Sequence, residues 1–76
     1  MFAIIYSMKY EIKFKLKELR KEKGLTQKQL AALLNKSETG LASWEQGLSE
    51  PNINDLRTLC KIFEVSADYL LGLSDN

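Results

Sequence analysis

Hydrophobic residues recur along most of this chain at intervals of three and four positions, the spacing that places side chains on one face of an α-helix. The five stretches are Ile12, Leu16 and Leu19; Leu30, Leu33 and Leu34; Leu41 and Trp44; Ile53, Leu56, Leu59, Cys60 and Phe63; and Leu70 with Val65 before it. The last four stretches follow residues that commonly cap helix N-termini, namely Thr26, Ser37, Asn52 and Ser66. The pattern predicts a compact all-α domain of five helices over residues 12–73, followed by a short tail over residues 74–76.

Residues 1–11 follow a different pattern. Apolar residues fall at every second position from Phe2 to Ile12, although two residues between them are apolar too, and a period of two indicates a β-strand. Because a lone strand is not stable in water, this extension is expected to pair with another chain, to pack on the core or to be disordered. Another interpretation is that Met8 is the natural first residue. The segment lacks the basic start and cleavage site of a signal peptide, and it is shorter than the roughly 20 residues that cross a bilayer.

The composition narrows the classes of function. A chain of 76 residues has room for one small domain, and it contains no His and a single Cys, Cys60. A single Cys cannot form an internal disulfide, and no cluster of acidic residues suggests a metal site. We therefore predict a cytoplasmic protein without a metal or another cofactor. We also predict that it is not an enzyme, because it has no activated nucleophile and no glycine-rich phosphate loop.

The net charge of +1 conceals two halves of opposite charge. Residues 1–36 carry nine basic side chains against three acidic ones, whereas residues 37–76 carry two basic side chains against seven acidic ones. The first half could therefore approach a polyanion while the second half faces away. The alternative is that the lysines only solvate an exposed helix face, and charge alone does not decide between these interpretations.

The segment from Gln27 to Gln46 has the spacing of two short helices joined by a tight turn. Thr26 and Gln29 predict a capping box at the start of the first helix. Asn35 lies at the turn, where a left-handed backbone is expected and Asn tolerates it. The residues that would face each other across the two helices are Leu30, Ala31, Leu34, Leu41 and Trp44. This arrangement is typical of a helix-turn-helix.

Residues 12–72 resemble the Xre-type, lambda-repressor-like helix-turn-helix family. The matching positions are Leu19-Arg20, Lys23 to Gln27, Leu30-Ala31, Ser37, Leu41, Trp44 to Gly47, Pro51, Leu56 and Val65 to Gly72. The resemblance implies a five-helix domain that binds double-stranded DNA. It also implies that the helix from Glu38 to Gln46 lies in the major groove, as phage repressors of this class place theirs.

The resemblance further implies which residues contact DNA. Base edges would be read by Glu38, Thr39 and Ser43, with Gly40 allowing close approach. Phosphates would be bound by Gln27, by Lys28 and Lys36, and by the backbone around Gly47 to Ser49. An alternative role for Glu38 is to favour the positive N-terminus of its own helix. Arg20 and Glu45 stand where the family has an ion pair between the first helix and the recognition helix, so we assign them a structural role, and we place Trp44 and Cys60 in the core.

The sequence departs from the family pattern in two places. Lys36 occupies a position where the family buries an aliphatic residue, so we expect its stem to pack while its amine reaches outward. The recognition helix, which follows Lys36, contains no Arg or Lys, so we expect a modest DNA affinity for each monomer.

These features predict a sequence-specific transcriptional repressor that binds a palindromic operator as a homodimer. Two copies on half-sites about 34 Å apart would compensate for the few base contacts that one helix makes. The dimer surface would involve the last helix, with Tyr69, Leu70, Leu71 and Leu73, or the N-terminal strand. The alternative is an antitoxin-like module that binds mainly a partner protein and also its own promoter.

Overall fold

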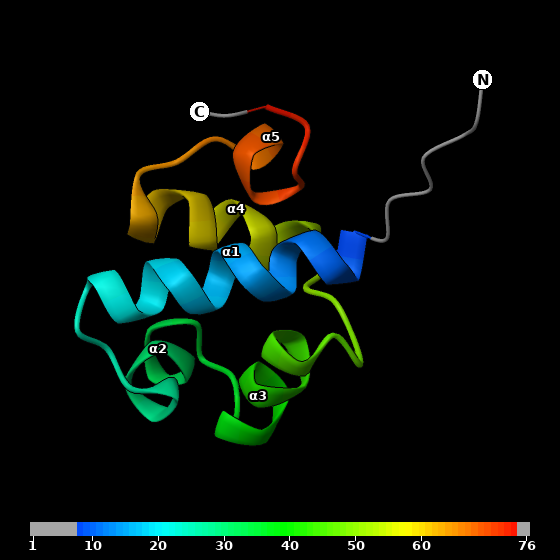
Figure 1. The fold of residues 1–76 in the computed structure, drawn as a ribbon. Helices are drawn as coiled ribbons and strands as arrows, with labels where there is room; N and C mark the ends of the chain where they lie inside the picture. Colours follow the sequence, from blue (N-terminus) through cyan, green and yellow to red (C-terminus); the bar gives the residue numbers. More distant parts are fainter. Residues whose placement is uncertain (1–7, 75–76) are drawn as a thin grey trace.

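The computed structural model describes residues 8–74, and this part of the chain folds into five helices without a strand. They are α1 (Met8–Glu22), α2 (Gln27–Leu33), α3 (Glu38–Gln46), α4 (Ile53–Phe63) and α5 (Ala67–Leu70). Figure 1 shows α1 through the middle of the molecule, with α2 and α3 on one side and α4 and α5 on the other. The predicted all-α, five-helix fold is confirmed. Within the described residues, no helix is both long and apolar enough to cross a membrane.

Every helix contributes one fully buried leucine to a single core. These residues are Leu16, Leu30, Leu41, Leu59 and Leu70, in order from α1 to α5. Burying such a side chain stabilises a fold by roughly 1.5–3 kcal/mol. The central helix α1 contacts both α3 and α5, so one core fixes α3 relative to the rest of the domain.

Side-chain caps begin the four helices after α1. In each case the cap oxygen accepts a hydrogen bond from the backbone N–H three residues later: Thr26 from Gln29, Ser37 from Gly40, Asn52 from Asp55 and Ser66 from Tyr69. The Gln29 side chain also accepts from the Thr26 N–H, which completes the predicted capping box. Each cap is worth about 1 kcal/mol, so short-range chemistry sets these helix starts.

The structure differs from the predicted pattern at the start of α1. This helix begins at Met8, so the strand prediction is wrong for residues 8–11, while residues 1–7 lie outside the described residues. A helix that already buries Ile12 and Leu16 extends by one hydrogen bond per added residue, which needs no new nucleus. The helical continuation therefore prevails over the period-two pattern.

Two apolar residues are also less buried than predicted. Leu33 is 57% exposed, because the buried face of α2 is centred on Leu30, Ala31 and Leu34, and Leu33 points about 110° away from that centre. Cys60 is half-buried at the edge of the core, and burial raises the pKa of its thiol. Its thiol therefore stays protonated and serves as a small apolar group.

Candidate nucleic-acid interface

The turn between α2 and α3 is fixed by backbone hydrogen bonds. The Asn35 N–H donates to the Ala32 carbonyl at 3.1 Å, and the Lys36 N–H donates to the Ala31 carbonyl at 2.9 Å. Asn35 has a φ of 57°, the left-handed conformation that the sequence predicted there. Ser37 then caps α3, so the chain enters α3 directly after a closed turn. The two helices contact each other as a helix-turn-helix.

The third helix has a buried face and an exposed face. Leu41, Trp44 and Glu45 are buried. Of the four residues predicted to read bases, Glu38 and Thr39 are exposed, and Gly40 and Ser43 are half-buried. Thr39 and Ser43 are four residues apart and so lie one above the other on the same side of the helix. The structure therefore brings Thr39 and Ser43 together on the face of α3 opposite the core.

A buried polar network connects α1, α2 and α3. The Arg20 Nε donates to Glu45 Oε2 at 2.6 Å, and its Nη2 donates to Glu45 Oε1 at 3.1 Å. The same Oε1 accepts a hydrogen bond from the Gln27 Nε2 at 3.1 Å, and the Arg20 Nη1 donates to the Leu25 carbonyl at 2.8 Å. Such a bidentate pair fixes the orientation of both charged groups. Gln27 is therefore held at the α2–α3 edge by the carboxylate that also holds Arg20.

A second polar contact joins α3 to the loop that follows it. The hydroxyls of Ser43 and Ser49 are 2.8 Å apart, and either oxygen could be the donor. The Ser43 carbonyl also accepts from the Leu48 N–H at 3.0 Å, while Gly47 ends α3 in the left-handed conformation with a φ of 77°. The structure therefore places a residue predicted to read bases beside one predicted to bind phosphate.

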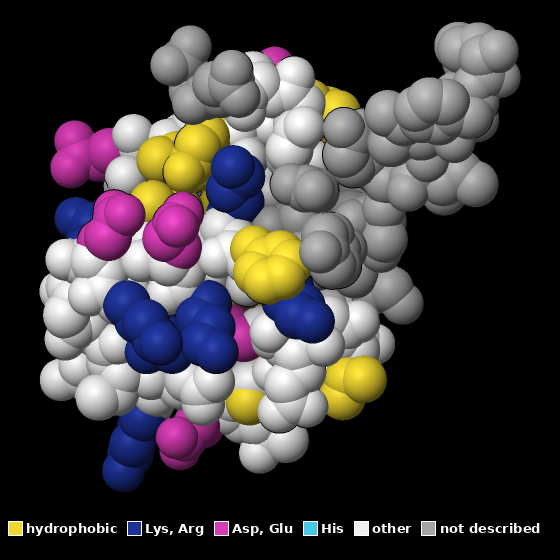
Figure 2. All heavy atoms as spheres, in the orientation of Figure 1, with side chains coloured by type: hydrophobic (Ala, Val, Ile, Leu, Met, Phe, Trp, Pro, Cys, Tyr) yellow, Lys and Arg dark blue, Asp and Glu magenta, His cyan; other side chains and the backbone are white. Residues whose placement is uncertain are grey.

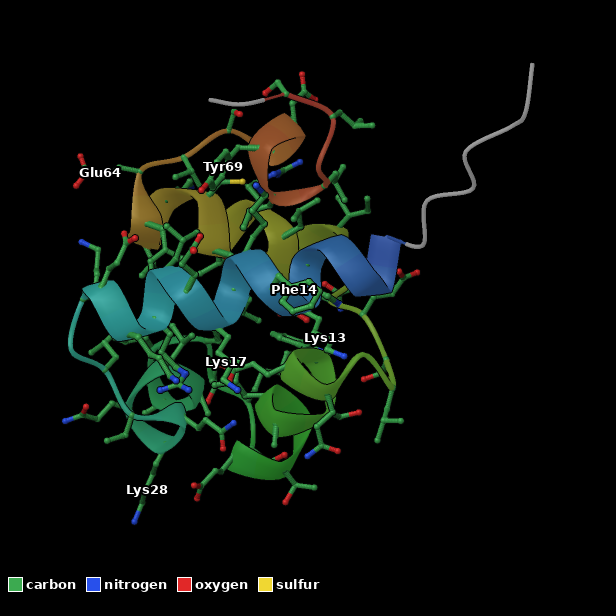
Figure 3. All side chains as sticks on the ribbon, in the orientation of Figure 1. Lys13, Phe14, Lys17, Lys28, Glu64 and Tyr69 are labelled. Atoms are coloured by element: carbon green, nitrogen blue, oxygen red, sulfur yellow. The ribbon has the colours of Figure 1, made fainter. Side chains whose placement is uncertain are left out.

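The two lysines predicted to bind phosphate differ in their surroundings. Lys28 is exposed, and Figure 3 shows its side chain extending from α2 away from the body of the molecule. The Lys36 amine instead lies 3.2 Å from Asp55 Oδ2, and the Asp55 side chain is only 11% exposed. This ion pair ties the turn to α4, a contact that no sequence signal indicated. Lys36 thus has a structural partner in the free protein.

Two further lysines near α3 were not predicted as site residues. Lys13, Lys17 and Arg20 are spaced by four and three positions and so share one face of α1. The two outer residues both reach α3: Arg20 pairs with Glu45, and a Cβ atom at Gly47 would lie 3.2 Å from the Lys13 Cδ. Lys17, between them, is exposed, and Figure 3 shows it pointing from α1 toward the α2–α3 side. The helical spacing from Arg20 was the signal that could have found it.

Lys13 and Lys17 place positive charge on the surface of α1, whereas Arg20 on the same face is buried and paired with Glu45. Figure 2 shows Lys and Arg side chains across the face where α1 meets α2 and α3. We call Lys13 and Lys17 the cationic band. It lies on the side of α1 that carries α2 and α3, so a positive potential is expected beside the helix-turn-helix.

Comparison with known proteins identifies the family. The family model described as Helix-turn-helix matches residues 16–70. The HTH-type transcriptional activator BcrR of Enterococcus faecalis is 44% identical over 62 residues, which are 82% of this chain and 30% of BcrR. The HTH-type transcriptional regulator ImmR of Bacillus subtilis is 40% identical over 58 residues, which are 76% of this chain and 46% of ImmR.

The chain thus spans less than half the length of these two relatives. No solved structure shows a significant match to it. The family match begins inside α1 and ends at the last residue of α5, so it includes the whole helix-turn-helix together with α4, α5 and the second half of α1. The resemblance inferred from the sequence is confirmed, and the chain belongs to the Xre-type helix-turn-helix family.

Proposed function

We propose that this domain is a sequence-specific transcriptional regulator that reads the major groove of double-stranded DNA with α3. The observation that carries the proposal is the polar outer side of α3, where Glu38 and Thr39 are exposed and Ser43 is half-buried. Hydroxyl and carboxylate groups are suited to base edges, and a carboxylate accepts from the amino group of cytosine. The Helix-turn-helix match and the regulator names of the relatives support this assignment.

Phosphate contacts would hold α3 in register without reading sequence. We assign these contacts to Gln27 and Lys28 at the start of α2 and to the loop from Gly47 to Ser49, and the Gln27 side chain lies against α3 through its hydrogen bond to Glu45. Lys17 of the cationic band adds a charge, because it is exposed and has no ion-pair partner among the described residues. Lys36 is the weakest of the predicted contacts, since binding a phosphate would compete with its pair to Asp55.

The proposed active form is a homodimer on a palindromic operator. One α3 offers few base contacts, and a second copy doubles them when the half-sites lie about 34 Å apart. Leu70 is fully buried in the core of its own subunit and so is excluded from the predicted dimer surface, whereas Leu73 is 68% exposed. We propose repression as the outcome where the operator overlaps a promoter, although BcrR is named as an activator.

Selection from a random DNA pool tests the proposal most directly. We expect the recovered sequences to share an inverted repeat whose half-site centres are about 10 base pairs apart, as the two-fold dimer requires. Recovery of no common sequence would contradict sequence-specific binding. A single, non-repeated site bound by one copy would contradict the dimer alone.

Single substitutions then separate base reading from phosphate binding. Thr39→Ala and Ser43→Ala are expected to change which bases are preferred at particular positions, because each removes a group that faces the base edges. Gln27→Ala is expected to weaken binding to all sequences by a similar factor. Affinities measured against every single-base variant of the selected site distinguish the two patterns. Equal binding by all three variants and the wild type would overturn the assignment of α3.

The salt dependence of binding tests the cationic band. Lys17→Gln is expected to reduce the slope of log K against log salt concentration by about 0.9, since one phosphate contact and its counterion are lost. Lys61→Gln is the matched control, because Lys61 is exposed on α4, on the other side of α1 from α3. An unchanged slope for Lys17→Gln would remove this residue from the interface.

A further inference from the structure

We propose that Ser49 determines which bases Ser43 can hydrogen-bond, so that the loop after α3 contributes to sequence preference without contacting a base. The proposal rests on the proposed function, in which Ser43 faces base edges and Ser49 faces a phosphate. Its structural basis is the 2.8 Å contact between the two hydroxyl oxygens.

The contact is held in place by the end of α3. The Leu48 N–H donates to the Ser43 carbonyl at 3.0 Å, and the Gly47 N–H donates to the Trp44 carbonyl at 3.2 Å. These backbone bonds fold the loop back onto the last turn of α3 and bring Ser49 against Ser43. Within the described part of the chain, neither hydroxyl has a second hydrogen-bond partner. Each therefore keeps unused hydrogen-bonding capacity that a ligand could engage.

Counting hydrogen atoms shows what a bound phosphate would do to this pair. Each hydroxyl has one hydrogen and two lone pairs. In the free protein either serine can donate to the other. A phosphodiester oxygen can only accept, so a phosphate contact made by the Ser49 hydroxyl uses the hydrogen of that hydroxyl. The bond between the two serines can then persist only if Ser43 donates its hydrogen to the Ser49 oxygen.

Ser43 is left with lone pairs alone toward the DNA. In the major groove its partner must then be an amino group, which adenine carries at N6 and cytosine at N4. Guanine and thymine present carbonyl oxygens at the corresponding positions, which would face those lone pairs without a hydrogen between them. Ser43, with Ser49 as its positioning residue, should therefore favour adenine or cytosine on the contacted strand over guanine and thymine.

The test compares Ser49→Ala with Ser49→Thr on a selected site and on its single-base variants. Ser49→Ala removes the acceptor that holds the Ser43 hydrogen, so Ser43 can donate as well as accept. At the position whose preference Ser43→Ala abolishes, we expect Ser49→Ala to reduce the preference for amino-bearing bases about twofold to tenfold, the effect of one neutral hydrogen bond. Ser49→Thr keeps a hydroxyl and should retain the wild-type preference. Thermal unfolding monitored by circular dichroism checks that all variants are folded.

A base analogue tests the direction of the hydrogen bond. Where adenine occupies this position, replacing it with unsubstituted purine, which lacks the amino group, should weaken wild-type binding and leave Ser43→Ala unaffected. A Ser49→Ala variant that keeps the full base preference, or a wild type that binds the purine analogue equally well, would overturn the inference and leave α3 as the reading helix. A wild type that selects no sequence at all would overturn both the inference and the proposed function.

Discussion

Replacing Glu45 with Ala is expected to lower the free energy of unfolding by about 3–5 kcal/mol, because it leaves a buried guanidinium without its carboxylate. The side chains of Glu45 and Arg20 are only 3% and 11% exposed. After the substitution, Arg20 would keep the Leu25 carbonyl as its partner, and Gln27 would lose its acceptor. A domain of this length is stable by only about 4–11 kcal/mol in total. Urea unfolding followed by circular dichroism would measure the loss.

Two variants make this prediction specific to the buried pair. Glu18→Ala removes an exposed carboxylate from α1 and is expected to change the stability by less than about 0.5 kcal/mol. The double variant Arg20→Met and Glu45→Leu replaces both charges with apolar groups and should recover most of the stability, because no charge is left buried alone. If Glu45→Ala cost no more than Glu18→Ala, the ion pair would not be a structural link between α1 and α3.

The features best predicted from the sequence were those that depend on residues close together in the chain. The caps at Thr26, Ser37, Asn52 and Ser66 each satisfy an N–H group three positions away, so residue type and spacing were sufficient to place them. The left-handed conformation of Asn35 was also predictable from a local property, because Asn tolerates this conformation better than most residues. Glu64 also adopts this conformation, with a φ of 55°, but a Glu gives no such signal.

Contacts between distant segments were not predictable in the same way. Lys36 and Asp55 are 19 positions apart and form a pair across the turn and α4, which depends on how the two helices are packed. The exposure of Leu33 has a similar origin. Three apolar residues of α2 fit a helical pattern, but the packing of the neighbouring helices decides which of them face the core.

The same distinction between local signals and tertiary contacts applies to the candidate site. Family resemblance implied a DNA-contacting role for Gln27, Ser43 and Ser49, because the motif indicates which positions of the family meet DNA. It did not supply their mutual contacts. The Gln27–Glu45 and Ser43–Ser49 hydrogen bonds depend on side-chain conformations that spacing does not determine. Under the proposed function these contacts decide how each group would meet DNA, so the structure adds hydrogen-bond chemistry to positions that the resemblance only suggested.

Replacing Leu30 with Ala is expected to cost about 2–5 kcal/mol, the usual range for a buried leucine. Leu30 is fully buried and lies in α2, within the core cluster that also contains Leu41 of α3. Truncating it removes favourable contacts and leaves a cavity that a well-packed core cannot fill completely. Because α2 supports the recognition helix, DNA affinity should fall together with stability, and both can be measured at low temperature where part of the protein is still folded.

Leu33→Ala provides the matched control in the same helix. The chemical change is identical, but Leu33 is 57% exposed, so its expected cost is within about 0.5 kcal/mol. The difference between the two variants therefore measures burial alone, since helix propensity favours Ala slightly at both positions. If Leu33→Ala destabilised the domain as much as Leu30→Ala does, Leu33 would be buried in solution, either by its own subunit or by a second copy covering this side of α2.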